Sequence, residues 1–528
     1  MSPRTAVEVV EPERLERWLA PRTDIVLEEV SEPGVFTLVE GPFRHYRRTI
    51  HHEPVIDPGG PDEGKVRVHQ TLDFQLDTPL AGWLFLIPVR RLLSQPARSG
   101  RRPPWWHPPD RMDQRTAKVM ARLALLSIIY GYLGVIISQT LTFAADSFDA
   151  SDGDQGFVLA AVRIGGLISL WVAFSADRRG RRPLLALASI AGILITAIGA
   201  AAPSLLWLGV SQTVARGLAT ALNLVVGVAA AEEVPAGSRA WAASVLTLCA
   251  GLGAGMVLWV LPVADLDPDA WRIVYLIPLI ALPLVMRAIQ DLPESRRFER
   301  TSSRAPEQSE STRGRLARTY AAGRVFSGDR RLILLSSTAF LFSIFASPAS
   351  QFLNEYLRDE QGFSAARIAL YRLVTATPAG IGIMIGGRLA DVRGRRSVGA
   401  VALFVGSMAS LLIYWTSGPP LWAFSLLGTV VGAAAVPALG VYGEELFPTG
   451  RRASSKGIIT LIAVMGSAIG VIATGQISDR VGSLAIPITF LAVAPVVVTA
   501  MIRFLYPETA RLELEHINPE DQLPDDPR

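Results

Sequence analysis

Long runs of apolar residues, separated by short charged loops, dominate the sequence after residue 116. A helix that crosses a bilayer needs about 20 mainly apolar residues. Twelve runs meet this requirement: 119–145, 156–176, 183–202, 205–231, 240–263, 271–290, 331–354, 366–390, 397–416, 420–443, 455–477 and 483–505. The pattern therefore predicts an all-α membrane protein with twelve transmembrane helices.

The loops between these runs alternate in their content of arginine and lysine. Basic residues are concentrated before the first run, after the second at 178–182, after the eighth at 393–396, after the tenth at 451–456 and in the long segment after the sixth. The other loops are poor in arginine, and the loop at 264–270 is acidic. Because basic loops stay on the cytoplasmic side of a membrane, we expect a multi-pass protein of the cytoplasmic membrane with both termini in the cytoplasm.

Residues 1–116 have a different pattern, with frequent charges and prolines. Apolar and polar side chains alternate with period two within 35–76, which indicates strands with one buried face. We expect a small antiparallel sheet of about three strands, followed at 79–93 by a short helix that lies at the membrane surface. The histidines of this region are taken as exposed strand residues, and no metal site is predicted.

These patterns divide the chain into domains. The predicted boundaries are, in chain order, a cytoplasmic N-terminal domain with a short antiparallel sheet and a linker at 1–116, a six-helix half at 117–292, a cytoplasmic central loop at 293–330, a second six-helix half at 331–506 and a cytoplasmic tail at 507–528. The central loop is rich in serine, arginine and glutamate, a composition typical of solvated, flexible segments.

The composition agrees with a membrane class and excludes other classes. Hydrophobic residues make up 50% of the chain, and its net charge of +4 is too small to favour a nucleic-acid partner. Cys249 is the only cysteine, so no internal disulfide can form. The sequence contains no Gly-x-x-x-x-Gly-Lys-Ser/Thr loop and no recognisable cluster of nucleophile, base or metal ligands. We therefore expect no enzyme activity, no cofactor and no metal, with the lipid bilayer as the surroundings.

Short charged motifs occur at corresponding places in the two halves. Asp177 begins the stretch DRRGRR after the second run, and Asp391 begins DVRGRR after the eighth. Pro293 begins PES after the sixth run, and Pro507 begins PET after the twelfth. After the fourth and the tenth runs, a glutamate precedes an arginine by six residues. A parallel repeat of six-helix halves is typical of transporters that expose a central site to the two sides of the membrane in turn.

In these motifs the chain resembles the major facilitator superfamily over residues 117–515. The Asp-x-x-Gly-Arg-Arg stretch is similar to the loop motif of that family. The Pro-Glu motifs are similar to those of its sugar-porter, organic-ion and metabolite:proton symporter branches. Two departures are visible: Ala173 stands where the second half has Gly387, and the fifth run lacks the Gly-Pro pair of drug antiporters. The second departure argues against an exporter.

The resemblance also implies a role for the charged helix ends. In the family, the Asp of the loop motif pairs with arginine and with a neighbouring helix N-terminus, and this holds the halves together on the cytoplasmic side. Both contacts are favourable for a carboxylate. Two gating networks are predicted: Asp177, Arg181, Glu233 and Arg239, and Asp391, Arg395, Glu445 and Arg451. The alternative is that these arginines only set the topology.

Polar residues inside the runs are the candidates for substrate and proton binding. An arginine at the centre of a membrane helix costs about 2.5–3.5 kcal/mol on insertion scales, so Arg163 and Arg216 are expected to face the cavity between the halves. The other candidates are Asp146, Glu355, Gln139, Asn223, Tyr130 and Gln351. The alternative for each is a bond to a neighbouring helix or a place at the outer rim.

We therefore expect a secondary active transporter that moves a small organic solute across the cytoplasmic membrane by alternating access, with the proton as coupling ion and uptake as direction. Two cavity arginines and few buried carboxylates favour an anionic substrate. A drug or metabolite exporter, and a transporter-like sensor that uses the N-terminal domain, remain as alternatives.

Overall fold

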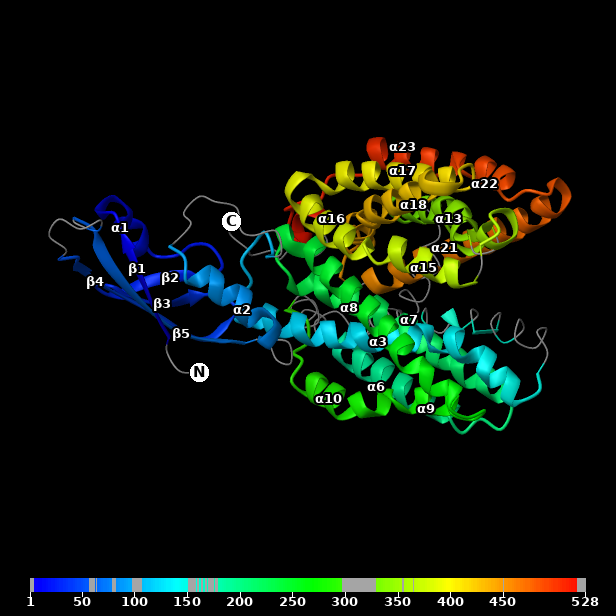
Figure 1. The fold of residues 1–528 in the computed structure, drawn as a ribbon, viewed down its shortest axis with the longest axis horizontal. Coiled ribbons are helices and arrows are strands. Elements are labelled where there is room, and N and C mark those ends of the chain that lie inside the picture. Colours follow the sequence, from blue (N-terminus) through cyan, green and yellow to red (C-terminus); the bar gives the residue numbers. More distant parts are fainter. Residues whose placement is uncertain are drawn as a thin grey trace, which may run out of the picture. The chain divides into compact units, whose positions relative to one another are not determined.

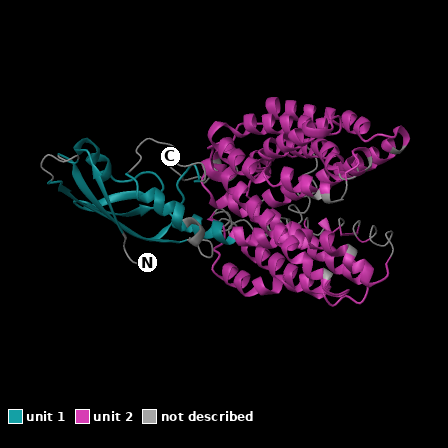
Figure 2. Cartoon of the chain, in the orientation of Figure 1, with its two compact units in different colours: residues 1–122 teal, residues 123–528 magenta. Residues whose placement is uncertain are grey.

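The chain folds into two compact units, residues 1–122 and 123–528 (Figure 2). The structure is a computed structural model that describes residues 4–56, 62, 64–77, 82–96, 107–150, single positions between 158 and 175, 179–296, 329–353, 356–363, 365–449 and 451–519. The division between the units falls within helix α3 (Gln114–Ser147).

Unit 1 contains a five-stranded antiparallel sheet with the strand order β1-β5-β4-β3-β2 (Figure 1). The strands are β1 (Arg4–Val10), β2 (Leu27–Glu32), β3 (Val35–Glu40), β4 (Phe43–Pro54) and β5 (Val66–Leu76). The alternating pattern predicts β3, β4 and β5 but misses β1 and β2, which form the two edges of the sheet. An edge strand has fewer neighbours, and the last four residues of β2 are exposed, so its sequence lacks the apolar alternation of a buried strand.

Helices α1 (Pro12–Leu19) and α2 (Gly82–Leu93) pack against this sheet. The second half of α2 buries Val89, Leu92 and Leu93 among sheet residues. Burial of a side chain of this size contributes about 1.5–3 kcal/mol. The helix expected at the membrane surface is therefore a core element of unit 1 on this face, while Ile87 on another face is exposed.

Two buried arginines bind the C-terminal ends of these helices. Arg48 donates to the carbonyl oxygen of Trp18 at 2.9 Å and forms an ion pair with Glu28 at 2.6 Å. Arg22 donates to the carbonyl oxygen of Leu93 at 3.2 Å. Carbonyl groups in the last turn of a helix lack intrahelical partners and attract cations. The burial of both arginines is therefore explained by their contacts within unit 1.

Within the described part of unit 2, eleven spans have the length and composition of membrane helices, and each coincides with a predicted run. The remaining run, 156–176, lies largely outside the described residues. The helices that follow α3 are α6 (Arg182–Gly199), α7 (Leu205–Glu233), α8 (Arg239–Val260), α9 (Trp271–Leu276), α10 (Pro278–Gln290), α13 (Arg330–Gln351), α15 (Ala365–Ala376), α16 (Ala379–Arg393), α17 (Arg395–Ile413), α18 (Gly418–Ala433), α19 (Ala435–Gly440), α20 (Tyr442–Glu445), α21 (Arg452–Val481), α22 (Ala485–Leu491), α23 (Val493–Leu505) and α24 (Leu514–Ile517). These spans and the sheet of unit 1 confirm the predicted fold class.

Two of the spans are interrupted at prolines. The run 271–290 consists of α9 and α10, which meet at Pro278, and the run 366–390 consists of α15 and α16, which are separated at Pro378. A proline has no N–H to donate to the preceding turn, and its ring crowds the carbonyl group four residues earlier. The hydrophobic pattern predicts the span but not this division.

Helices α3–α10 form one half of unit 2 and α13–α23 form the other, and α8 of the first half lies beside α16 of the second (Figure 1). The hydroxyl group of Ser244 on α8 donates to the carbonyl oxygen of Ile383 on α16 at 2.9 Å. A Cβ atom at Gly387 of α16 would lie 2.6 Å from the carbonyl oxygen of Ala240. The close approach of the halves at this point therefore requires glycine.

Candidate functional site

Charged side chains from both halves meet where α7, α16 and α20 end and where α8, α17 and α21 begin. We call this group the charge cluster; it consists of Arg181, Glu232, Arg239, Asp391, Arg395, Glu445 and Arg452. None of these residues exposes more than 3% of its surface. Buried charges persist only when they are paired and hydrogen-bonded, and every member of the cluster has an oppositely charged partner within it.

Glu232 is the centre of one side of the cluster. Its carboxylate accepts hydrogen bonds from Arg181 at 2.9 Å, from Arg452 at 2.6 Å and from the hydroxyl group of Ser295 at 2.6 Å. Arg181 also donates to the carbonyl oxygen of Thr449 at 2.7 Å. Glu232 and Arg181 belong to the first half, whereas Arg452 and Thr449 belong to the second. This side of the cluster therefore joins the two halves.

Glu445 is the centre of the other side of the cluster, as Glu232 is of the first. Its carboxylate pairs with Arg395 from its own half and with Arg239 from the first half, the latter at 3.2 Å. Asp391 pairs with Arg395 at 3.0 Å and accepts hydrogen bonds from the backbone amides of Ala240 at 3.3 Å and Trp241 at 2.9 Å. These amides lie in the first turn of α8, where unpaired N–H groups favour a carboxylate.

The two sides are related by one sequence motif. Aligned on Pro235 and Pro448, both halves read Glu-x-x-Pro-x-x-x-Arg, with Glu232 and Arg239 in the first half. Glu445 and Arg452 are the counterparts in the second. Each arginine pairs with the glutamate of the opposite half. The arginine of each motif thus pairs with the glutamate of the other motif. The predicted networks instead paired Arg239 within the first half and Arg451 within the second.

The structure brings together five of the eight residues in the predicted networks. Arg181, Arg239, Asp391, Arg395 and Glu445 lie in the charge cluster, and Asp177 lies outside the described residues. Glu233 and Arg451 occupy other positions. Their places are taken by the adjacent residues Glu232 and Arg452.

The two described residues that fall outside the charge cluster, Glu233 and Arg451, have other partners. Glu233 accepts a hydrogen bond from the backbone amide of Arg296 at 2.6 Å. Arg451 is exposed and lies 3.3 Å from Asp329. Successive residues of a helix point about 100° apart. Of the adjacent residues Glu232 and Glu233, only one can therefore face the arginines of the charge cluster.

The Pro-Glu motifs are also placed by the structure, and sequence reasoning gave them no structural role. The carboxylate of Glu294 accepts from the backbone amides of Arg181 at 2.8 Å and Arg182 at 3.1 Å, where α6 begins. Glu508 accepts from the amide of Arg395 at 2.8 Å in the same way, where α17 begins. Both glutamates therefore satisfy amides at a helix N-terminus that the helix itself leaves unpaired.

One face of α7 carries accessible polar residues inside a predicted membrane span. Arg216, Thr220 and Gly227 are partly exposed and Asn223 is exposed, whereas the residues between them are buried. Spacings of three and four residues place these four positions on one face of the helix. From Ala215 to Glu233 the other residues of α7 are buried, so this polar, accessible face is expected to point toward the interior of the protein rather than toward lipid.

Arg216 lies against α3, close to Tyr130. A Cβ atom at Gly134 would be 3.2 Å from Nη1 of Arg216 and 3.7 Å from Cε2 of Tyr130. Among the residues that the structure describes, no carboxylate lies within ion-pair distance of Arg216. The guanidinium group is therefore available to an anionic ligand on this face.

The remaining candidates are spread more widely. Gln139 is half-buried on α3, and Asp146 and Gln351 are exposed near the ends of α3 and α13. Arg163 and Glu355 lie outside the described residues, so the structure places neither of them. Asp146 and Gln351 therefore have the position of rim residues.

Sequence reasoning missed Arg372 on α15. This arginine lines a cavity of about 250 Å³ in the second half and donates to the carbonyl oxygen of Ser350 at 3.4 Å. The same cavity is lined by the hydroxyl-bearing residues Ser350, Thr375, Ser407, Ser410, Ser425 and Thr429. The sequence does contain a signal for Arg372, because it is a charged residue inside the apolar run 366–390. Arg163 and Arg216 were selected as candidates by the same criterion.

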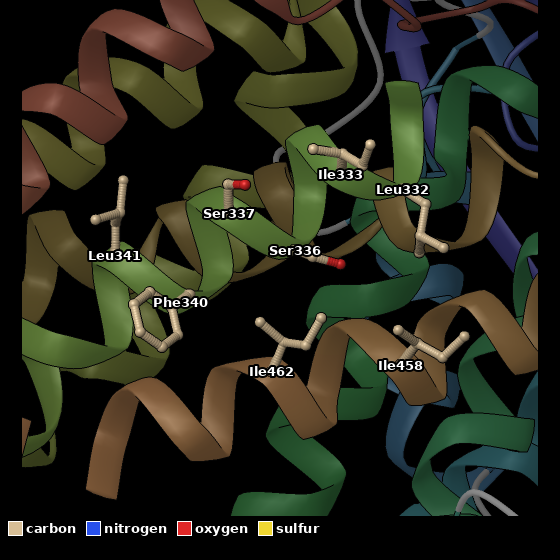
Figure 3. Close-up of a pocket in the computed structure, with 8 residues that line it drawn as sticks. All are labelled: Leu332, Ile333, Ser336, Ser337, Phe340, Leu341, Ile458 and Ile462. Atoms are coloured by element: carbon tan, nitrogen blue, oxygen red, sulfur yellow. The ribbon is translucent and has the colours of Figure 1, made fainter. Parts of the chain in front are cut away.

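A second hollow lies between α13 and α21, with a volume of about 450 Å³ (Figure 3). Its lining is apolar apart from two hydroxyl groups and consists of Leu332, Ile333, Ser336, Ser337, Phe340, Leu341, Ile458 and Ile462. It contains no charged group. The lining of this hollow therefore has no charged group that could pair with an organic ion.

Comparison with known proteins agrees with this architecture. The sequence model of the Major Facilitator Superfamily matches residues 123–379 and 352–522. The chain is 24% identical over 375 residues to the cis,cis-muconate transport protein of Acinetobacter baylyi, which covers 68% of this chain and 87% of that protein. It is 25% identical over 436 residues to the glucose transporter GlcP of Staphylococcus epidermidis, which covers 75% of this chain and 94% of that protein.

The fold is similar to that of the proton:xylose symporter XylE, with a TM-score of 0.64 and 16% sequence identity, over 77% of this chain and 99% of that chain. The family match covers more than half of the chain and includes every residue of the charge cluster. The family and these relatives are transporters, not enzymes. On these grounds the chain belongs to the major facilitator superfamily.

Proposed function

We propose that this multi-pass membrane transporter carries a small organic anion, with a dicarboxylate as the first substrate to test. The observation that carries the proposal is Arg216, an arginine on an accessible intramembrane face with no carboxylate partner among the described residues. Arg372 supplies a second cation in the other half. One of the relatives transports cis,cis-muconate, which has two carboxylate groups.

We propose that the charge cluster is the gate on the cytoplasmic side. It lies next to the basic loops, which the positive-inside rule assigns to the cytoplasm. Two of its ion pairs, Arg239–Glu445 and Arg452–Glu232, run between the halves, so the halves can separate at this end only when these two pairs break. Alternating access by rocking of two halves requires such a reversible contact. In this proposal the structure corresponds to a conformation closed to the cytoplasm.

We further propose proton-coupled uptake as the energy source and direction. The sequence has no nucleotide-binding loop of the Gly-x-x-x-x-Gly-Lys-Ser/Thr type, so accumulation of a solute needs an ion gradient. Uptake of cis,cis-muconate into proteoliposomes should be faster with an acidic exterior and should fall when a protonophore collapses the gradient. Uptake that does not depend on the proton gradient would contradict proton coupling but not the choice of substrate.

The first experiment is thermal stabilisation of the purified protein by cis,cis-muconate, glucose and an organic cation at two pH values. A ligand that binds the native state raises its apparent stability by mass action. We expect stabilisation by the dicarboxylate that is lost in Arg216→Ala and kept in Arg503→Ala, a control because Arg503 is exposed on α23. Stabilisation by glucose alone would contradict an anionic substrate.

A further inference from the structure

An ion pair between Glu444 and Lys456 lies beside the charge cluster but is not part of it. Glu444 is in α20 and Lys456 is in the second turn of α21. Their side chains expose 8% and 20% of their surface. Among the described residues, Glu444 is the one acceptor that Lys456 Nζ has. The pair is therefore mostly enclosed, but the lysine side chain retains partial access to solvent.

The pair lies against the accessible face of α7. A Cβ atom at Gly227 would lie 2.5 Å from Nζ of Lys456 and would also collide with the carboxylate of Glu444. Gly227 follows Asn223 by four residues, one helical turn or about 6 Å along the axis. Arg216 lies three turns before Gly227 on the same face. The ion pair is therefore located where the polar face of α7 approaches the charge cluster.

This pair has no counterpart in the first half. The alignment on the two prolines places Ala231 opposite Glu444 and Ala243 opposite Lys456. Both members of the pair also belong to the second half, so the pair cannot hold the halves together. In the opening motion proposed above, α7 moves away from this end of the second half, and the pair then faces the opened cavity.

We propose that Lys456 is a second subsite for a carboxylate group of the substrate, reached from the side of the membrane on which the charge cluster lies. In the closed conformation the carboxylate of Glu444 occupies this subsite. Once α7 has moved away, a substrate carboxylate replaces Glu444 as the partner of the ammonium group. One charge-assisted hydrogen bond is exchanged for another of the same kind. The inference rests on the proposed transport of an organic anion.

The test is the concentration of cis,cis-muconate that half-saturates transport, measured separately from each side in sealed vesicles of both orientations. On the charge-cluster side, Lys456→Gln should raise this concentration about ten-fold, since it removes a hydrogen bond between charged groups. Glu444→Gln should lower it, because the competing carboxylate is gone. From the opposite side both variants should resemble the wild type, as should the control Arg503→Gln on both sides.

Each other outcome overturns the proposal. A pair that only supports the packing would change both single variants in the same direction, and the double variant Glu444→Gln/Lys456→Gln would regain the wild-type value. If Lys456→Gln does not assemble, the double variant replaces it and should still show the raised concentration. Equal effects from both sides, or none, also refute the subsite. If the wild type moves no dicarboxylate, the proposed function itself fails, and this subsite fails with it.

Discussion

Burial distinguishes adjacent residues of the same type in this protein. Arg452 is fully buried and paired with Glu232 of the opposite half, whereas Arg451 is exposed. Removal of one partner from a buried ion pair leaves an uncompensated charge, which costs about 3–5 kcal/mol. An exposed pair contributes about 0–1 kcal/mol. The two arginines are therefore expected to differ greatly in their importance for the closed conformation.

We expect Arg452→Ala to slow transport of cis,cis-muconate at least about ten-fold, because the closed conformation loses several kcal/mol. Arg451→Ala is the matched control and should transport at the wild-type rate. Initial rates in proteoliposomes measure both, after the amount of inserted protein has been equalised. If Arg451→Ala were as slow as Arg452→Ala, burial would not be the property that matters at this position.

Part of the charge cluster could be predicted from the sequence. Asp391, Arg395 and Glu445 follow from the repeated motifs and the family resemblance. The choice of Glu233 came from counting six residues back from an arginine, which set the two halves out of register by one residue. Alignment on the prolines corrects the register and selects Glu232. The exchange of partners between the halves could not be predicted, because it depends on how the two halves pack.

At the scale of the elements, length and hydrophobicity predict the spans well because a bilayer imposes both on a helix. The edge strands of unit 1 are not predicted, since one face and one edge of each lack neighbours and their sequences carry little alternation. The contact between α8 and α16 is likewise a property of two elements together. It depends on Gly387, which the sequence showed only as a departure between the two loop motifs.

We expect Gly387→Ala to loosen this contact, because its Cβ would lie 2.6 Å from a backbone oxygen of Ala240. Overpacking of this kind costs about 1–3 kcal/mol. Amides in the first turn of α8 should then exchange hydrogen faster, since they move away from Asp391. Gly255→Ala on α8 is the control, as no atom lies within 4 Å of its added Cβ. Unchanged exchange in Gly387→Ala would show that the helices adjust without cost.

At the scale of the whole molecule, the two units differ in what they contain. The charge cluster, the polar face of α7 and the cavity at Arg372 all lie within residues 123–528. Unit 1 has its own core, and its two fully buried arginines bind the C-terminal ends of α1 and α2. If the transport site is built wholly from residues 123–528, as proposed, the other unit is available for a separate task. This division is the physical basis of the sensor hypothesis.

Deletion of residues 1–106 should therefore leave transport of cis,cis-muconate at the wild-type rate, because the deletion removes no residue of the cluster or of the polar face. Initial rates in proteoliposomes and the melting temperature of the purified variant measure the outcome together. A variant that keeps its melting temperature but loses transport would show that unit 1 takes part in the conformational cycle. Preserved transport would instead show that transport does not require unit 1. A search for a signal that depends on residues 1–106 and on bound substrate would then test whether this transporter also acts as a sensor.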